Sequence, residues 1–600
     1  MSKKSTCLIG RVSSLASSSS STANPTANSQ DDVQAIVSPL GYKSAVWKYF
    51  GFLKKDGSTD KTHAICKKCR SAIKYSGNTT NLSGHLIKKH GIDPHEACGN
   101  VVDVSAVFSP QKLNHNSKRA MSITAAISNL FCKDMRPYCV VENAGFRELH
   151  HTLEPKYTIP SRQFFSDTCI PKLYNDAKDN VKRELMEAKR VALTTDSWTS
   201  CTTEVYVTVT SHHIDADWQM KNFVLQTRVL NDSHTGANLA AVLREACEEW
   251  NIRDRNPALV TDNASNMTVA GAEAKMTPHI KCFGHTINLA TQRGLKCVGA
   301  TRLLGRVRRI VTFFHRSTVA TAVLKEKQKL LGIPVHKLKQ DVSTRWISSF
   351  DMLERFLEQQ AAVCASLLDR KIRKGVNDIH TLSESDITVA EDMVKLLGPV
   401  RTATTIMCEE KQPTLSVITP LRAKLLVHYL DTEEDSALLG EMKETMSREL
   451  SQRYKDVQQV LHIASALDAR FKTLPFLSEE EKEAAFQRIT YEALELWDQK
   501  VNSEGEDEEN MDQEDGDGDS ETVRKEVMSY FGENPIPRDD NPLSWWKDNA
   551  IRFPTVAAVA KSYLSIPATS TASERLFSVA GNIVSKKRAS LCVFKASRFH

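Results

Sequence analysis

The sequence predicts an α/β protein in which a small zinc-binding unit precedes a mixed sheet and a long all-helical segment. Three observations lead to this fold class. Paired cysteines and histidines lie in a short basic segment, apolar residues alternate as in strands between residues 191 and 261, and apolar residues follow helical spacing from 346 to 500. A chain of 600 residues is long enough for several such domains.

Composition excludes a membrane-spanning protein. Hydrophobic residues make up 41% of the chain and charged residues 25%, as in soluble globular proteins. No apolar run approaches the roughly 18 to 20 residues that span a bilayer. The apolar stretch Cys7–Ile9 is too short for a signal peptide. We therefore expect no membrane partner and a reducing compartment, in which the 14 cysteines are thiols or metal ligands.

The charge is unevenly distributed. The net charge is +6, yet residues 504–521 hold eleven acidic residues and no basic one, while residues 41–91 hold eleven basic residues and two aspartates. Such a basic segment favours a polyanionic partner, namely nucleic acid. A solvated, lysine-rich surface is the alternative.

Composition and periodicity divide the chain into seven regions. Val205, Val207 and Val209 alternate with polar residues, which indicates a strand, and Met352, Leu353 and Phe356 have helical spacing. The predicted regions are a disordered Ser-rich arm (1–40), the zinc unit (41–91), a linker with short helices (92–145), the first part of the sheet domain (146–345), an all-α segment (346–500), an acidic disordered loop (501–525) and a final globular region (526–600).

The cysteines and histidines of the basic segment have zinc-ligand spacing. Cys66, Cys69, His85 and His90 form a C-x2-C-x15-H-x4-H pattern. Two thiolates two residues apart bind one side of a tetrahedral ion, and two histidines about one helical turn apart complete it. Because a unit of this size has little core, Zn²⁺ would supply much of its folding free energy.

This segment resembles a BED-type zinc finger. The resemblance rests on Val46–Phe52, on the ligand spacing and on Tyr75–Thr79. It implies that the finger binds double-stranded DNA through a helix in the major groove, with Ser83, Lys88 and Lys89 on or near that helix. Basic residues around the ligands complete the candidate phosphate contacts: Lys67, Lys68 and Arg70. No Arg or Asn pair suited to bidentate base readout stands out.

Three carboxylates in the body have positions suited to metal chemistry. Asp196 and Asp262 each end a predicted strand, and Glu574 begins a predicted helix. Together they could hold two Mg²⁺ ions that cleave a phosphodiester bond. Strand-end aspartates and helix-start glutamates are also common as caps and turn formers, which is the alternative.

The body is similar to hAT-type transposases from about residue 146 to 591. The segments that carry the resemblance include Thr195–Trp198, Cys282–Leu289, Ser343–Trp346 and Leu467–Lys472. It implies an RNase H-like mixed sheet interrupted by a large all-α insertion, followed by the last RNase H-like helix and a hAT C-terminal dimerisation region within 526–600. The family continues beyond Leu591 into a further helix, whereas this chain stops within nine residues, so we expect a truncated, weakened homodimer interface.

The same resemblance assigns roles to single residues. Asp196, Asp262 and Glu574 would be the metal carboxylates, with Mg²⁺ or Mn²⁺. His285 would contact DNA phosphate, unless it forms a buried polar pair with Cys282. Trp346 would stack on an extruded base, unless it is a core tryptophan. A second zinc site formed by His279, Cys282 and His285 lacks a fourth ligand.

The finger and body together resemble the zinc finger BED domain-containing proteins. This implies a nuclear, zinc-dependent DNA-binding protein derived from a hAT transposase, self-associating, with no small-molecule substrate, and acting as a transcription regulator. An active transposase that cuts and joins DNA is the alternative, because the three carboxylates are present. A SUMO ligase-like regulator is a further alternative, which rests on family resemblance only.

Overall fold

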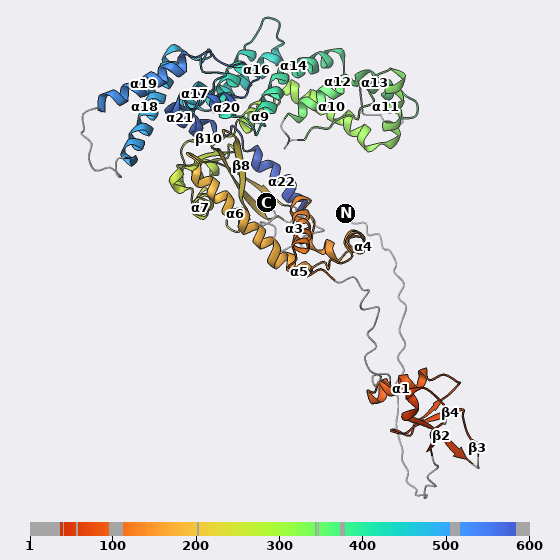
Figure 1. Cartoon of the computed structure of the whole chain (residues 1–600). Coiled ribbons are helices and arrows are strands. Elements are labelled where there is room, and N and C mark those ends of the chain that lie inside the picture. The colour runs from red at the N-terminus through yellow and green to blue at the C-terminus, as the bar shows by residue number, and fades with distance from the viewer. Residues whose placement is uncertain are drawn as a thin grey trace. The chain divides into compact units, whose positions relative to one another are not determined.

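The computed structural model describes most of the chain in two compact units. One unit ends at Gln111 and the other begins at Lys112 (Figure 1). Most of the predicted Ser-rich arm, part of the acidic loop and the last seventeen residues lie outside the described parts. The described residues are 36–39, 41–55, 58–94, 112–200, 203–342, 345, 347–372, 379–504 and 516–583. No helix among them has the length and apolar character needed to cross a membrane.

The first unit is a small antiparallel sheet packed against one helix. Its strands are ordered β1-β2-β4-β5, with β3 on β2. Trp47, Phe50, Leu82 and Leu86 form its buried core. The helix ends where Gly91 takes a left-handed conformation that favours glycine. The elements are β1 (Ile36–Val37), β2 (Phe50–Lys55), β3 (Ser58–Thr59), β4 (His63–Cys66), β5 (Ala72–Lys74) and α1 (Thr80–His90).

The second unit opens with a helical cluster that has its own apolar core. We predicted a linker with short helices over 92–145; its described part instead contains a 16-residue helix whose Ile127 and Phe131 are buried against Phe165 and Ile170. Ile127 and Phe131 lie about one helical turn apart, so both point to the same face of this helix and pack there. The helices of the cluster are α3 (Lys118–Lys133), α4 (Ala144–Leu153), α5 (Arg162–Phe164) and α6 (Ile170–Glu187).

A five-stranded mixed sheet forms the centre of the second unit. The strand order is β10-β9-β6-β7-β8. β7 is antiparallel to β6 and β8, whereas β9 is parallel to β6 and β10. The elements here are β6 (Ala192–Thr199), β7 (Val205–Ile214), β8 (Met220–Val229), α7 (Gly236–Glu249), β9 (Ala258–Thr261), α8 (Ser265–Glu273), β10 (His279–Lys281) and α9 (Phe283–Gly294).

Both faces of this sheet are buried, as successive residues of its strands show. Leu193 and Leu259 point to one face and pack with α7 and α8. Ala192, Val260 and Ile280 point to the other face and join the largest core, which continues into the helices that follow. The sheet therefore positions the residues at its strand ends rigidly.

The helical segment begins at Val298 in α10, earlier than the predicted boundary at 346. Its Leu303, Val307, Ile310 and Phe314 have helical spacing and are buried. Helix α19 also extends over part of the predicted acidic loop. The insertion comprises α10 (Val298–Arg316), α11 (Thr318–Leu330), α12 (Ser348–Glu358), α13 (Gln360–Leu367), α14 (Glu384–Met407), α15 (Ile418–His428), α16 (Ala437–Gln452), α17 (Gln458–Ala466), α18 (Glu479–Glu504) and α19 (Gly516–Gly532).

Three final helices return the chain to the sheet. They are α20 (Pro542–Asn549), α21 (Pro554–Leu564) and α22 (Thr571–Ile583). Helix α22 packs on β6 and β7, and α21 packs on β7 and α18. The start of α22 therefore lies on the sheet although the whole helical insertion separates the two in sequence. The fold class is thus confirmed: an α/β chain with an N-terminal finger, a sheet domain and a helical insertion.

Candidate metal and nucleic-acid sites

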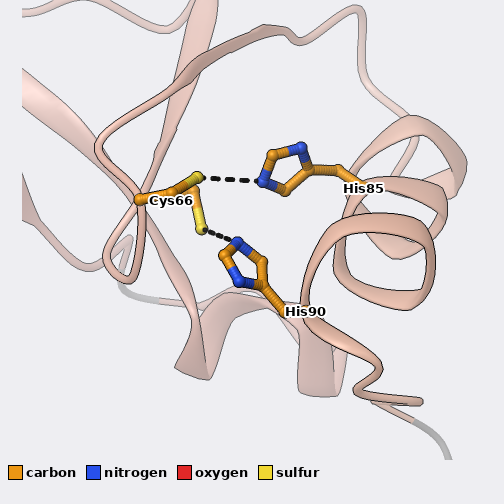
Figure 2. A group of neighbouring side chains, drawn as sticks. Cys66, His85 and His90 are labelled. Carbon is orange, nitrogen blue, oxygen red and sulfur yellow. Dashed lines mark hydrogen bonds between the residues drawn. The ribbon is translucent and has the colours of Figure 1, made fainter.

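The four predicted zinc ligands converge in the first unit. Strand β4 ends at Cys66, the turn after it carries Cys69, and α1 carries both histidines. The sulfur of Cys66 lies 3.5 Å from Nε2 of His90, and that of Cys69 lies 3.2 Å from Nε2 of His85 (Figure 2). All four ligand atoms lie within 4.8 Å of one another.

This geometry fits a tetrahedral zinc ion. Zn–S bonds of about 2.3 Å and Zn–N bonds of about 2.0 Å give a sulfur–nitrogen edge of about 3.5 Å. The two observed distances, 3.2 and 3.5 Å, match that edge. Hydrogen bonding to the side chain and backbone of Ser71 lowers the pKa of Cys69 to about 5, which favours the thiolate that binds metal. The ring of Phe50 packs edge-on against His85, with centroids 5.8 Å apart, and holds this ligand.

The predicted DNA-contacting residues of the finger differ in their surroundings. Lys88 and Lys89 are exposed in the last turn of α1. Lys68 and Arg70 are exposed in the turn between β4 and β5. Nζ of Lys67 donates to Oγ of Ser38 at 2.6 Å within the finger. The hydroxyl oxygen of Ser83 is buried, with no hydrogen-bond partner among the described residues.

A second group of ligand atoms lies in the body, where three elements meet. Asp196 comes from β6, His285 from the first turn of α9 and Glu574 from the first turn of α22. One ligand atom from each lies within 4.8 Å of the other two. Nε2 of His285 is 3.7 Å from Oε1 of Glu574. The side chains of His285 and Glu574 are 26% and 30% exposed, so the group is open to solvent on one side.

Buried hydrogen bonds hold these elements together. Oγ of Ser573 lies 2.9 Å from Oγ1 of Thr194 on β6. The backbone N–H of Phe283 donates to the carbonyl of Ala568 at 2.8 Å, and the N–H of Ser570 donates to the sulfur of Cys282 at 3.5 Å. The starts of α9 and α22 are therefore fixed on each other and on the sheet.

The carboxyl groups of this site are hard to ionise. Burial raises the pKa of Asp196 to about 7; the negative charges of Glu574 and Asp262 add to this, while His285 opposes it. Burial also raises the pKa of Glu574, with a further contribution from Asp262. Buried carboxyls close to one another are stabilised in the charged form by a cation.

Asp262 lies near this group but is not part of it. Its Oδ1 accepts a hydrogen bond from the backbone N–H of Ala264 at 3.0 Å, as expected for a turn-forming aspartate. Its charge also acts on Lys281, which donates to Oγ1 of Thr268. The three carboxylates of the predicted triad are therefore near enough for the charge of Asp262 to raise the pKa of the other two. In the group whose ligand atoms lie within 4.8 Å, however, the third residue is His285 and not Asp262.

The remaining predicted residues give no second zinc site. Burial raises the pKa of Cys282 to about 11, which disfavours a thiolate, and Nε2 of His279 lies 2.8 Å from Oγ1 of Thr261. Among the described residues, only the two groups above bring three or more ligand atoms within 4.8 Å. Trp346 lies outside the described residues.

Four protein families match successive parts of the chain. The BED zinc finger matches residues 44–91, and the ZBED1 RNase-like domain matches residues 194–282. The ZBED1 RNase-like helical domain matches residues 280–396, and the hAT family C-terminal dimerisation region matches residues 526–592. The matches follow the order of the finger, the sheet, the insertion and the last helices.

Zinc finger BED domain-containing proteins and a transposase are among the proteins similar to this chain over most of its length. The human zinc finger BED domain-containing protein 4 is 26% identical over 94% of this chain, which spans about half (52%) of that protein's length. A putative AC transposase of Zea mays is 23% identical over 75% of this chain and 61% of its own length. The zinc finger BED domain-containing protein RICESLEEPER 2 of Oryza sativa is 22% identical over 88% of this chain and 82% of its own length.

Proposed function

We propose that this chain, which joins a BED zinc finger to the RNase-like and dimerisation domains of the hAT transposase-derived proteins, is a nuclear, zinc-dependent regulator that binds double-stranded DNA. The observation that carries the proposal is the four-ligand centre beside the exposed lysines of α1. Zinc fixes α1 on the small sheet. The helix then presents Lys88 and Lys89 on one side of the finger.

Lys88 and Lys89 would bind DNA through its phosphates. Their ammonium groups neutralise phosphate charge and release counterions, so affinity falls as salt rises. Arg70 and Lys68 add charge from the neighbouring turn. Because phosphate contacts position a protein without reading bases, sequence preference would come from other contacts or from DNA shape.

Self-association would strengthen this binding. Two tethered fingers raise the effective concentration of the second finger at its site. The matched dimerisation region, however, buries most of its large apolar side chains, including Trp546, Phe553 and Leu564, in the body. Met528 and Ile551, which are 64% and 92% exposed, are the exceptions among its described residues. A dimer built on those residues would therefore use a mainly polar contact.

The test is selection of bound duplexes from a random pool by the zinc-loaded chain. The chain with Cys66→Ser, which removes one zinc ligand, is the matched control. The proposal predicts enrichment of duplexes by the unaltered chain alone. Equal enrichment by both chains would place DNA binding outside the finger, and no enrichment by either would refute the DNA-binding function.

Metal-dependent phosphodiester cleavage is a second candidate function. It is favoured by the meeting of Asp196 and Glu574 across the helical insertion, with Asp262 close enough to raise the pKa of both. The three carboxylates would hold the divalent ions, which activate a water or 3′-hydroxyl. Strand cleavage of the selected duplex with Mg²⁺ or Mn²⁺, lost in Asp196→Asn, would support it. The absence of any cleavage would leave the body a binding module.

A further inference from the structure

We propose that Asp196, His285 and Glu574 form a site for a single divalent transition-metal ion, bound by one imidazole nitrogen and two carboxylates. Their ligand atoms lie within 4.8 Å of one another, the range in which one ion can contact all three. This ligand set differs from the three carboxylates of the cleavage candidate. This site also does not depend on the zinc finger. DNA binding by the finger and metal binding at this site can therefore each fail without the other.

The three side chains are fixed before any ion binds. Asp196 lies on the central strand β6, where it pairs with Thr208 of β7, two residues beyond the last pair that β6 forms with β9. The first turn of α9, which carries His285, is joined to the segment just before α22, the helix that carries Glu574, by the hydrogen bond from Phe283 N–H to the Ala568 carbonyl. A site whose ligands come from rigid, mutually anchored elements loses little conformational entropy when it binds.

The burial of the two carboxylates is poorly compensated. Asp196 is only 7% exposed and its Oδ1 accepts the Ser197 N–H at 2.7 Å, whereas Oε1 of Glu574 is buried with no hydrogen-bond partner among the described residues. Within the described parts of the chain, neither carboxylate makes an ion pair with a lysine or arginine. A bound cation would neutralise both groups, and the solvent-open side at His285 and Glu574 would let the ion enter.

The chemistry of the ligands selects the ion. Mg²⁺ prefers oxygen ligands and keeps several waters, and Mn²⁺ suits carboxylates, whereas an imidazole nitrogen suits Fe²⁺, Ni²⁺ or Zn²⁺. Asp262 would remain outside the ligand set, because it is not in the group whose ligand atoms all lie within 4.8 Å of one another. His285 should therefore control affinity more strongly than Asp262 does.

The test uses the full chain with its finger loaded with one equivalent of Zn²⁺, followed by titration with Mn²⁺. Mn²⁺ is chosen because its pulsed EPR spectrum reports coordinated nitrogen and because it competes poorly for thiolates. We expect one bound Mn²⁺ per chain with a ¹⁴N coupling from one imidazole. In His285→Gln the coupling should disappear and the affinity fall at least tenfold, while Asp262→Asn should retain the coupling.

Three results would overturn the proposal. The first is the absence of any stoichiometric Mn²⁺ in the unaltered chain. The second is a bound Mn²⁺ with oxygen ligands only, whose affinity falls in Asp262→Asn rather than in His285→Gln; this would favour the three-carboxylate site instead. The third is a nitrogen coupling that persists in His285→Gln. Circular dichroism of the Zn²⁺-loaded variants, before Mn²⁺ is added, checks that each is folded before the titrations are compared.

Discussion

Trp546 is the side chain through which the last helices are most clearly joined to the rest of the body. It is fully buried, and its ring stacks on Trp218 of the β7–β8 connection at 5.6 Å and on Tyr530 of α19 at 5.1 Å. Its Nε1 donates to the carbonyl of Leu467 at 2.9 Å. One ring therefore touches the sheet domain, the insertion and the matched dimerisation region.

Two substitutions separate the packing of Trp546 from its hydrogen bond. Trp546→Ala removes a fully buried ring and should lower the free energy of unfolding of the body by about 3–5 kcal/mol. Trp546→Phe keeps most of the ring but leaves the Leu467 carbonyl without its donor, which should cost about 1–3 kcal/mol. Urea unfolding of the full chain, followed by far-ultraviolet circular dichroism, measures both.

Ile551→Ala is the matched control, since this side chain lies in the same region and is 92% exposed. Its effect should stay within about 0.5 kcal/mol. If Trp546→Ala were no more destabilising than Ile551→Ala, the last helices would not be part of the body's core. The reasoning from burial to stability would then fail for this region.

Three further outcomes follow from the same contacts. Cys66→Ser should unfold the finger and leave the body transition unchanged, as seen by zinc content and melting, because zinc contributes about 10 kcal/mol or more to such a unit. Ser573→Ala should lower body stability by about 0.5–1.5 kcal/mol in urea unfolding, since it removes one hydrogen bond of buried Thr194, whose hydroxyl keeps Thr210 and His212 as partners. Burial lowers the pKa of His212 to about 3, so between about pH 6.5 and pH 3 only the unfolded chain takes up this proton. As the pH is lowered through this range, the free energy of unfolding of the body should therefore decrease by about 1.4 kcal/mol per pH unit because of this group. In His212→Gln, urea unfolding should show a pH dependence smaller by that amount.

Local patterns were sufficient to predict the finger and the strands. Zinc-ligand spacing is a property of a short segment, and the alternation of Val205, Val207 and Val209 shows directly in β7. Family resemblance then supplied the joining of sheet, insertion and last helices. The prediction that Ser83 contacts DNA overlooked a signal in the helical spacing: Ser83 lies three residues before Leu86, so it shares the inward side of α1 and its oxygen is buried.

The ligand group in the body could not be read from local patterns. Which side chain joins Asp196 and Glu574 depends on how the segment around Ala568 docks against the start of α9. That docking brings His285 in, while the turn after β9 engages Asp262 with Ala264. The helical cluster after residue 112 was missed because its core joins Phe131 to Phe165, which are far apart in sequence.

The most direct test of DNA binding through the zinc finger is the salt dependence of affinity. Fluorescence anisotropy of a selected duplex would be measured from 50 to 300 mM salt with the zinc-loaded chain and with the double variant Lys88→Ala, Lys89→Ala. Each lost phosphate contact should reduce the slope of log affinity against log salt by about 0.9, so the account predicts a slope smaller by about 1 to 2 in the variant. An unchanged slope and affinity would contradict it.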